Sequence, residues 1–286
     1  MSETPPPLVR LERRGPVALL TLDAPPVNVL SAPVLEALVR RLEEVRADGS
    51  IRAVVLASAS PKAFAAGANI REMAPLTPAE ARAHGARGQG ATTAIERLPM
   101  PVIAAVHGVC LGGGCEIVLA CDFILASGDA TFGQPEVNLG VMPGWGGTQR
   151  LPRRVGTARA RYWIYTGRAV TAQEAVEQGL VLRVVARESL LDEALALAQE
   201  LAGKPADALA AAKYSVQFAV DRGLTIGLAY ELRRWEALFA TADQKEGMLA
   251  FLEKREWTPA PRDPTSPTAA VGGADPHPSA SGRRKS

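Results

Sequence analysis

The stretch PVIAAVHGVCLGGGCEIVLACDFILAS, residues 101–127, carries most of the information about the fold. VIAAVHG (102–108) is a continuous apolar run, typical of strands that are buried on both faces. Three glycines follow at 112–114; GGCEIVLAC (113–121) then predicts a buried helix and FILA (123–126) a further strand. A strand, a glycine turn and a helix place free backbone N–H groups where a ligand oxygen can approach them closely.

The same alternation extends in both directions along the chain. VALLTL (17–22) and AVVLAS (53–58) predict strands, and Ser31 precedes a helix whose apolar face includes Leu35, Leu38 and Leu42. From about 156 to 255 the pattern is mostly helical. This loose recurrence of strand, strand and helix predicts stacked turns of α/β structure followed by a helical C-terminal subdomain.

Composition excludes several classes of protein. The chain has 286 residues, a formal charge of +2 and an aromatic share of 5%, which argue against a surface that tracks phosphates or stacks on bases. It has no apolar run of the roughly 18 residues that a membrane span needs, and no apolar signal near its start, so we expect no membrane span and a cytoplasmic location. Cys110, Cys115 and Cys121 are odd in number and clustered, which favours buried free thiols over disulfides.

The two ends differ from the rest of the chain. Residues 1–7 are short and Pro-rich and are expected to be flexible, and residues 258–286, rich in Pro, Gly, Ser and Ala, are expected to be disordered. This tail accounts for the whole +2 excess, so residues 1–257 sum to zero. Between the ends we expect an α/β core over 8–200 that holds the active site, and a helical subdomain over 201–257.

Two glutamates stand out as candidates for chemistry. Glu116 lies in the first turn of an otherwise apolar helix, and a buried charge of this kind needs an explanation. Glu136 follows 20 residues later in FGQPEVNLG (132–140). Two carboxylates at one site can be separated by their surroundings into an acid and a base. The alternatives are that Glu136 is a solvated loop residue and that the glycines only permit tight helix–sheet packing.

At this point the sequence resembles a known family, the crotonase superfamily, and within it most closely the enoyl-CoA hydratases. The resemblance rests on KAFAAGANIREM (62–73), the stretch 101–127, ATFGQPEVNLGVMPGWGGTQRLPRRVG (130–156) and FATADQKEGMLAFLEKR (239–255). It covers about residues 8–257. It implies a crotonase-like spiral of repeated strand-strand-helix turns with a helical C-terminal subdomain that packs at the interfaces of a homotrimer or a dimer of trimers.

The resemblance also implies an activity, the hydration of a trans-2-enoyl-CoA to a 3-hydroxyacyl-CoA in fatty acid metabolism. The N–H groups of Ala68 and Gly113 would form an oxyanion hole for the thioester carbonyl. Glu116, as carboxylate, would activate water for addition at Cβ, and Glu136, as acid, would protonate Cα. No metal or redox cofactor is implied, because coenzyme A is part of the substrate. The alternative activities are isomerisation of an enoyl-CoA or another crotonase-family reaction.

Further positions match the family less firmly. The segment implied to lie along coenzyme A contains Ala66, Ala68, Asn69, Ile70 and Arg71, with Asn69 standing where the family commonly has Asp. Phe251 and Lys254 match a helix that reaches the nucleotide across a subunit interface; the alternative for Lys254 is an ordinary solvated lysine.

Three other features bear on the pocket and on function. Trp145 is bulkier than the residue many members carry, so it either narrows the acyl pocket or serves packing. Residues 80–92, which shape that pocket in the family, contain three glycines and predict a weak, mobile helix. His107 is expected to be structural. A non-catalytic role in acyl-CoA sensing or RNA binding is the remaining alternative, and the neutral core weighs against RNA.

Overall fold

A computed structural model describes residues 8–265 of the chain. The N-terminal residues 1–7 and the greater part of the tail, 266–286, lie outside this range, so the expectations for them stay untested.

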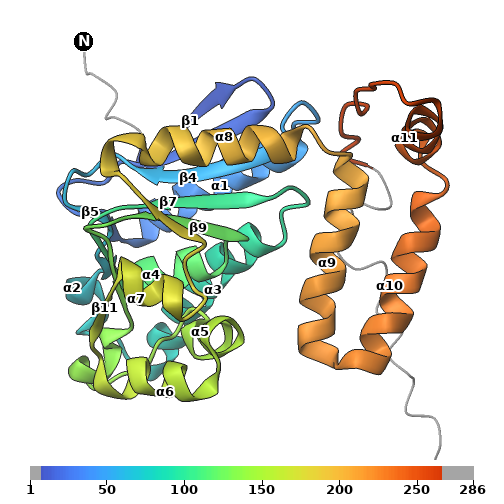
Figure 1. The fold of residues 1–286 in the computed structure, drawn as a ribbon. Helices are drawn as coiled ribbons and strands as arrows, with labels where there is room; N and C mark the ends of the chain where they lie inside the picture. Colours follow the sequence, from blue (N-terminus) through green and yellow to red (C-terminus); the bar gives the residue numbers. More distant parts are fainter. Residues whose placement is uncertain (1–7, 266–286) are drawn as a thin grey trace, which may run out of the picture.

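The core is built on a mostly parallel sheet whose central strands are the apolar runs found in the sequence (Figure 1). In spatial order it contains β1 (Val9–Arg14), β2 (Val17–Leu22), β4 (Ala53–Ser58), β7 (Val102–Val106), β9 (Phe123–Ser127) and β12 (Arg183–Val185). Among the described strands of this sheet, β1 and β2 are the one antiparallel pair. Strands β4, β7 and β9 are buried on both faces, which is why they lack the alternation of a half-exposed strand.

A second sheet lies beside the first and gives the fold its repeat. It contains, in order, β11 (Ala169–Thr171), β10 (Thr131–Gly133), β8 (Val109–Leu111) and β5 (Ala63–Ala65), and a small ladder joins β3 (Val29–Leu30) to β6 (Gly67–Ala68). Each turn of chain supplies one strand to each sheet, as β4 and β5, β7 and β8, then β9 and β10. The predicted strand-strand-helix spiral is therefore confirmed.

Helices cover both faces of the large sheet. α8 (Leu190–Ala202) packs on one face through a cluster that includes Leu190, Ala194 and Ala198. The other face buries α1 (Ala32–Ala47) and α4 (Gly113–Leu119) in a larger apolar cluster. The remaining helices of the core are α2 (Ile70–Met73), α3 (Pro78–Glu96), η1 (Pro135–Leu139), α5 (Gly147–Val155), α6 (Thr157–Thr166), α7 (Ala172–Glu177) and η2 (Arg187–Ser189).

The segment predicted to be a weak helix is the middle of α3. A capping box opens this helix: the side chain of Thr77 accepts from the N–H of Glu80, and the carboxylate of Glu80 accepts from the N–H of Thr77. Such a box satisfies two helix-end donors that would otherwise lack partners. The helix is therefore formed despite its glycines; its mobility stays a prediction.

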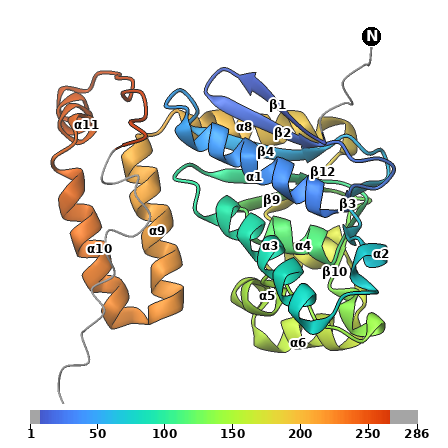
Figure 2. The same cartoon turned by 180° about the vertical axis from the view of Figure 1, so that it is seen from behind.

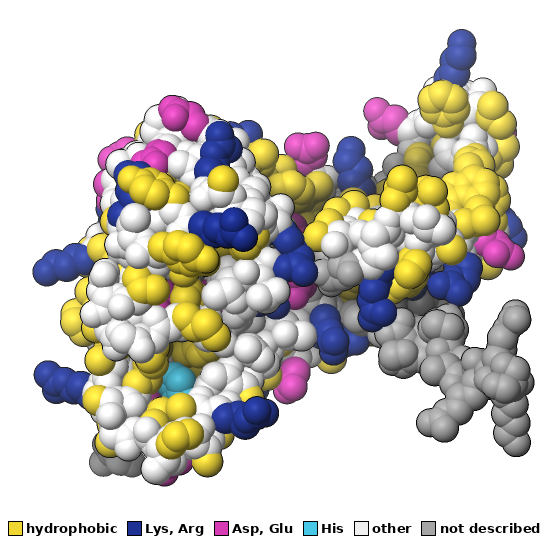
Figure 3. Space-filling view, turned by 90° about the horizontal axis from the view of Figure 1, so that it is seen from below, with side chains coloured by type: hydrophobic (Ala, Val, Ile, Leu, Met, Phe, Trp, Pro, Cys, Tyr) yellow, Lys and Arg dark blue, Asp and Glu magenta, His cyan; other side chains and the backbone are white. Residues whose placement is uncertain are grey.

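Three C-terminal helices project from the core as an arm (Figures 1 and 2). They are α9 (Ala206–Arg222), α10 (Leu224–Leu238) and α11 (Ala242–Glu253). Apolar side chains remain exposed along the arm, among them Leu224 at 74% and Phe251 at 82%. Seen from below, this part of the molecule carries several yellow patches of hydrophobic side chains (Figure 3). No helix of the described chain is both long and apolar enough to cross a membrane.

The chain returns to the core after the arm, which departs from the expectation of disorder starting at residue 258. Arg262 is 5% exposed and donates hydrogen bonds to the carbonyls of Arg46, Asp48 and Ile51 at the C-terminal end of α1. Arg52 donates to the carbonyls of Lys204, Pro259 and Ala260. Composition missed this contact because it depends on two arginines that meet carbonyls far away in sequence.

Candidate active site

Three loops meet at one edge of the second sheet. Strands β5, β8 and β10 run parallel, and Cys110 on β8 pairs with Ala65 on β5 and with Phe132 on β10. The carboxyl ends of parallel strands lie at the same edge, where ligands of α/β proteins commonly bind. The register therefore brings together residues 66–68, residues 112–113 and residues 134–136, which contain the predicted site residues Ala68, Gly113 and Glu136.

The first two loops touch through their glycines. Gly67 has φ of +100° and Gly112 has φ of +53°, a region that favours glycine. A Cβ on Gly67 would lie 3.0 Å from the carbonyl oxygen of Leu111 and 3.6 Å from the nitrogen of Gly113. Gly113 begins α4, so its N–H is among the donors that have no acceptor within the helix. The loop that contains Ala68 therefore lies next to the start of α4 at Gly113.

Glu116 is deeply buried and held by backbone donors. Its side chain is 2% exposed, and its Oε1 accepts from the N–H groups of Trp145 and Gly147, both at 2.7 Å. The pKa of this carboxyl is raised overall, because burial outweighs the lowering by the two N–H donors and by the positive charge of Arg150. Those donors favour the ionised form, which is the form that a general base needs.

Glu136 has a different environment. It lies in η1, its Oε1 would be 3.2 Å from a Cβ on Gly112, and its Oε2 is buried without a hydrogen-bond partner among the described residues. Burial raises the pKa of Glu136 to about 7, and the nearby charge of Glu116 adds to the rise. The two carboxyls therefore differ in their hydrogen bonding as an acid and a base would.

The implied coenzyme A residues fall into two groups. Ala66, Ile70 and Arg71 are exposed beside the site. Asn69 caps α2, accepting from the N–H of Arg71 at 3.2 Å and donating to Glu72 at 2.8 Å, so the amide keeps a capping role that a carboxylate would also fill. Phe251 and Lys254 are exposed at the end of the arm, far from α2 in Figures 1 and 2, so one chain alone does not bring the two groups together.

Trp145 lies directly beside the site. It is 4% exposed, and its indole occupies the space that a Cβ on Gly113 would need, 2.4 Å from Cζ3. Its carbonyl accepts from the hydroxyl of Thr92 at 2.9 Å and from Arg150 at 3.1 Å. Sequence reasoning placed Trp145 near the acyl pocket but missed that its backbone holds Glu116.

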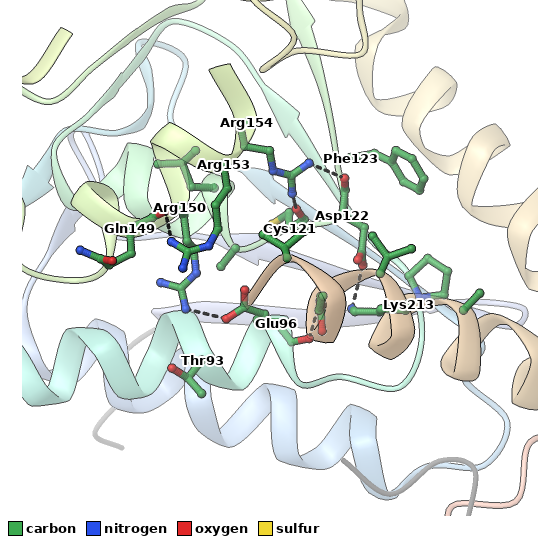
Figure 4. Close-up of a pocket in the computed structure, with 18 of the residues that line it drawn as sticks. Thr93, Glu96, Cys121, Asp122, Phe123, Gln149, Arg150, Arg153, Arg154 and Lys213 are labelled. Carbon is green, nitrogen blue, oxygen red and sulfur yellow. Dashed lines mark hydrogen bonds and ion pairs between the residues drawn. The ribbon is translucent and has the colours of Figure 1, made fainter. Parts of the chain in front are cut away.

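A cavity lies next to the site rather than in it. It has a volume of about 790 Å³ and lies between the core and α9 (Figure 4). Ion pairs cross it, Arg150 to Glu96 and Lys213 to Asp122, both at 2.7 Å. Neither Glu116 nor Glu136 lines this cavity, whereas Trp145 does.

The sequence predicts that His107 and the three cysteines are structural. A ring nitrogen of His107 contacts the carbonyl of Ser60 at 2.7 Å, in keeping with a structural role. Cys110, Cys115 and Cys121 are free and buried, as predicted. Within residues 8–265, no three His, Cys, Asp or Glu side chains are grouped so that they could hold a metal ion.

Comparisons with known proteins show the family of the chain. The family model described as "Enoyl-CoA hydratase/isomerase" matches residues 12–260. A "Probable enoyl-CoA hydratase" of Rhizobium meliloti is 47% identical over 247 residues, 86% of this chain and 95% of the relative. A "Short-chain-enoyl-CoA hydratase" of Clostridium acetobutylicum is 40% identical over 249 residues, 87% and 95% of the two chains.

A solved structure extends the comparison to three dimensions. The enoyl-CoA hydratase from Bacillus anthracis superposes with a TM-score of 0.84 at 38% identity, covering 89% of this chain and 99% of that one. The chain therefore belongs to the enoyl-CoA hydratase/isomerase family, and its fold is that of the crotonase superfamily.

Proposed function

We propose that this protein is an enoyl-CoA hydratase, which adds water across the 2,3 double bond of a trans-2-enoyl-CoA. The observation that carries the proposal is the contrast between its two buried carboxyls. Glu116 accepts two backbone N–H bonds that favour its ionised form, whereas the pKa of Glu136 is about 7 and one of its oxygens has no partner among the described residues. The names of the relatives support the same reaction.

The proposed reaction follows from these positions. The thioester oxygen sits between the N–H groups of Ala68 and Gly113, which polarise the conjugated double bond and make Cβ electrophilic. Glu116 takes a proton from water while the oxygen of that water bonds to Cβ. The electron pair of the double bond moves towards the thioester oxygen. Glu136 then delivers a proton to Cα, which restores the thioester. Glu116 returns its proton to solvent and Glu136 regains one, so the net change is the addition of one water.

The substrate's coenzyme A would lie along residues 66–71, where Ala66, Ile70 and Arg71 are exposed. Phe251 and Lys254 would come from a neighbouring subunit, because the arm of the same chain holds them away from this segment. A homotrimer or a dimer of trimers would bury the apolar side chains of the arm. Light scattering after gel filtration measures the molar mass of the assembly and so distinguishes the two. The reaction needs no cofactor beyond the coenzyme A of the substrate, and a cytoplasmic location remains part of the proposal.

The test is an assay of crotonyl-CoA hydration. The rate is measured from the loss of the absorbance of the conjugated thioester, and the product is identified as 3-hydroxybutyryl-CoA. Wild-type protein should form this product, and Glu116→Gln and Glu136→Gln should each lose orders of magnitude in rate while still binding butyryl-CoA. Near-normal turnover by either variant would overturn the assignment of the two glutamates. Conversion of a 3-enoyl-CoA without hydration would assign an isomerase instead.

A further inference from the structure

The indole of Trp145 fills the gap between two helices at points where both have glycine. A Cβ on Gly88 of α3 would lie 2.2 Å from Cδ2 and Cε2 of the indole, and a Cβ on Gly113 of α4 would lie 2.4 Å from Cζ3. His84, also on α3, borders the ring with centroids 5.8 Å apart. The indole thus occupies the space that a side chain at position 88 or 113 would need, so both positions accommodate it by being glycine.

The same residue lies next to both parts of the proposed reaction centre. Its ring contacts Gly113, the proposed donor to the thioester oxygen, and its N–H holds Glu116, the proposed base. Cβ of a bound enoyl group must lie within reach of both. Any acyl chain that continues beyond Cβ therefore has the indole as a near neighbour.

Space for a longer chain exists beyond the indole. The 790 Å³ cavity has Trp145 in its wall but not the two glutamates. One part of its wall is apolar and comes from the end of α4 and from α8 and α9, with Leu119, Ala120, Leu201, Leu209, Val216 and Val220. Another part is charged, with Glu96, Asp122, Arg150, Arg153, Arg154 and Lys213. A cavity of this size is typical of sites for small ligands. Trp145 belongs both to the wall of the cavity and to the surroundings of the proposed reaction centre.

We propose that Trp145 is the end wall of the acyl pocket and that it restricts the enzyme to short-chain enoyl-CoA thioesters. This inference rests on the proposed function. Removing the indole would connect the pocket to the cavity and let longer chains extend along α4. If Trp145 served packing alone, replacing it would lower the stability of the protein and would change kcat/KM by the same factor for every substrate. The preference for chain length would then stay unchanged.

The experiment compares kcat/KM for crotonyl-CoA, trans-2-hexenoyl-CoA and trans-2-octenoyl-CoA in wild type and Trp145→Ala. We expect the octenoyl-to-crotonyl ratio to rise at least about tenfold, because each methylene in a hydrophobic pocket changes discrimination by roughly 10-fold or more. The matched control is Trp163→Ala. Trp163 is also buried, and its Nε1 donates to Gln178 at 2.8 Å in another part of the core. The control should lose stability without changing the ratio.

A milder variant and a binding measurement keep the test decisive. If Trp145→Ala does not fold, Trp145→Phe should raise the hexenoyl-to-crotonyl ratio instead. An unchanged ratio in a folded variant, or the same change in Trp163→Ala, would overturn the proposal. Calorimetric titration with butyryl-CoA and octanoyl-CoA reports the same preference without turnover. The two proposals can fail separately. If the wild type hydrates no substrate but binds butyryl-CoA more tightly than octanoyl-CoA, and Trp145→Ala loses this preference, the proposed reaction is contradicted while the role of Trp145 as end wall is supported.

Discussion

The N–H of Trp145 donates to Oε1 of Glu116 at 2.7 Å, so one residue both borders the space next to the proposed reaction centre and holds its proposed base. The bond is made by the backbone, and the space is bounded by the side chain. The two roles are therefore separable by mutation, because replacing the indole leaves the N–H in place. The loop itself is anchored by Thr92 and Arg150, which donate to the carbonyl of Trp145.

Replacing Glu116 should separate its chemical role from its structural one. Glu116→Gln keeps an oxygen that accepts from Trp145 and Gly147, so the melting temperature should change little while crotonyl-CoA hydration falls by about 10²–10⁴-fold. Glu116→Leu should also lose stability, because two buried N–H groups are left without a partner at about 1–3 kcal/mol each. Calorimetry and hydration assays on both variants check this, and equal stabilities would contradict the geometry.

The raised pKa of Glu136 should make stability depend on pH. Its pKa rises from 4.5 to about 7 on folding, so the folded state binds this proton more tightly than the unfolded chain does. The stabilisation is complete below about pH 4.5 and is lost as pH rises through about 7. Glu136→Gln carries no charge, so its melting temperature should exceed that of wild type above pH 7, and the gap should close towards pH 5. A constant gap would contradict the raised pKa.

Hydration should also lose rate on the alkaline side. Glu136 acts as the acid in the proposed reaction, so kcat/KM should fall as pH rises through about 7, where the carboxyl loses its proton. Initial rates with crotonyl-CoA in buffers of increasing pH measure this fall in kcat/KM. A kcat/KM that stays constant well above pH 7 would assign the proton donor elsewhere.

The contact between the two glycine loops should be sensitive to a single methyl group. Gly67→Ala places a Cβ 3.0 Å from the carbonyl of Leu111 at a φ of +100°, so the backbone near Ala68 and Gly113 must shift. We expect kcat/KM to fall by about 10²–10³-fold, the usual effect of losing one oxyanion donor. Gly90→Ala is the matched control, because nothing lies within 4 Å of its Cβ. In α3 it should stabilise by about 0.5–1 kcal/mol and leave activity unchanged.

The return of the chain to the core should be measurable at Arg262. Arg262→Met removes the side-chain donor to the carbonyls of Arg46, Asp48 and Ile51, which should lower stability by about 1–3 kcal/mol. Arg255→Met removes an exposed arginine paired with Glu246 and Glu253 and should lower stability much less. Urea unfolding of both variants tests the contrast, and equal losses would argue against the buried contact.

The parts of the fold that the sequence predicts are those with local signals. β4, β7 and β9 are recognisable because burial on both faces makes them continuously apolar, and the glycines at 112–114 mark the turn into α4. The interactions that define the site are not local. The N–H donors to Glu116 lie 29 and 31 residues away on the next turn of the spiral, and backbone donors have no side-chain signature. The same holds for Arg262, whose carbonyl partners carry no sequence signal.

Arg52 holds the two ends of the projecting arm at one place on the core. Its guanidinium holds Lys204, just before α9, and Pro259 and Ala260, after α11, so the arm leaves and rejoins the core at the same place. Along its length α9 is also attached to the core, since Lys213 donates to Asp122 and Tyr214 donates to the carbonyl of Arg97. The angle at which the arm meets a neighbouring subunit in the proposed assembly therefore depends both on Arg52, at the two ends of the arm, and on these contacts of α9.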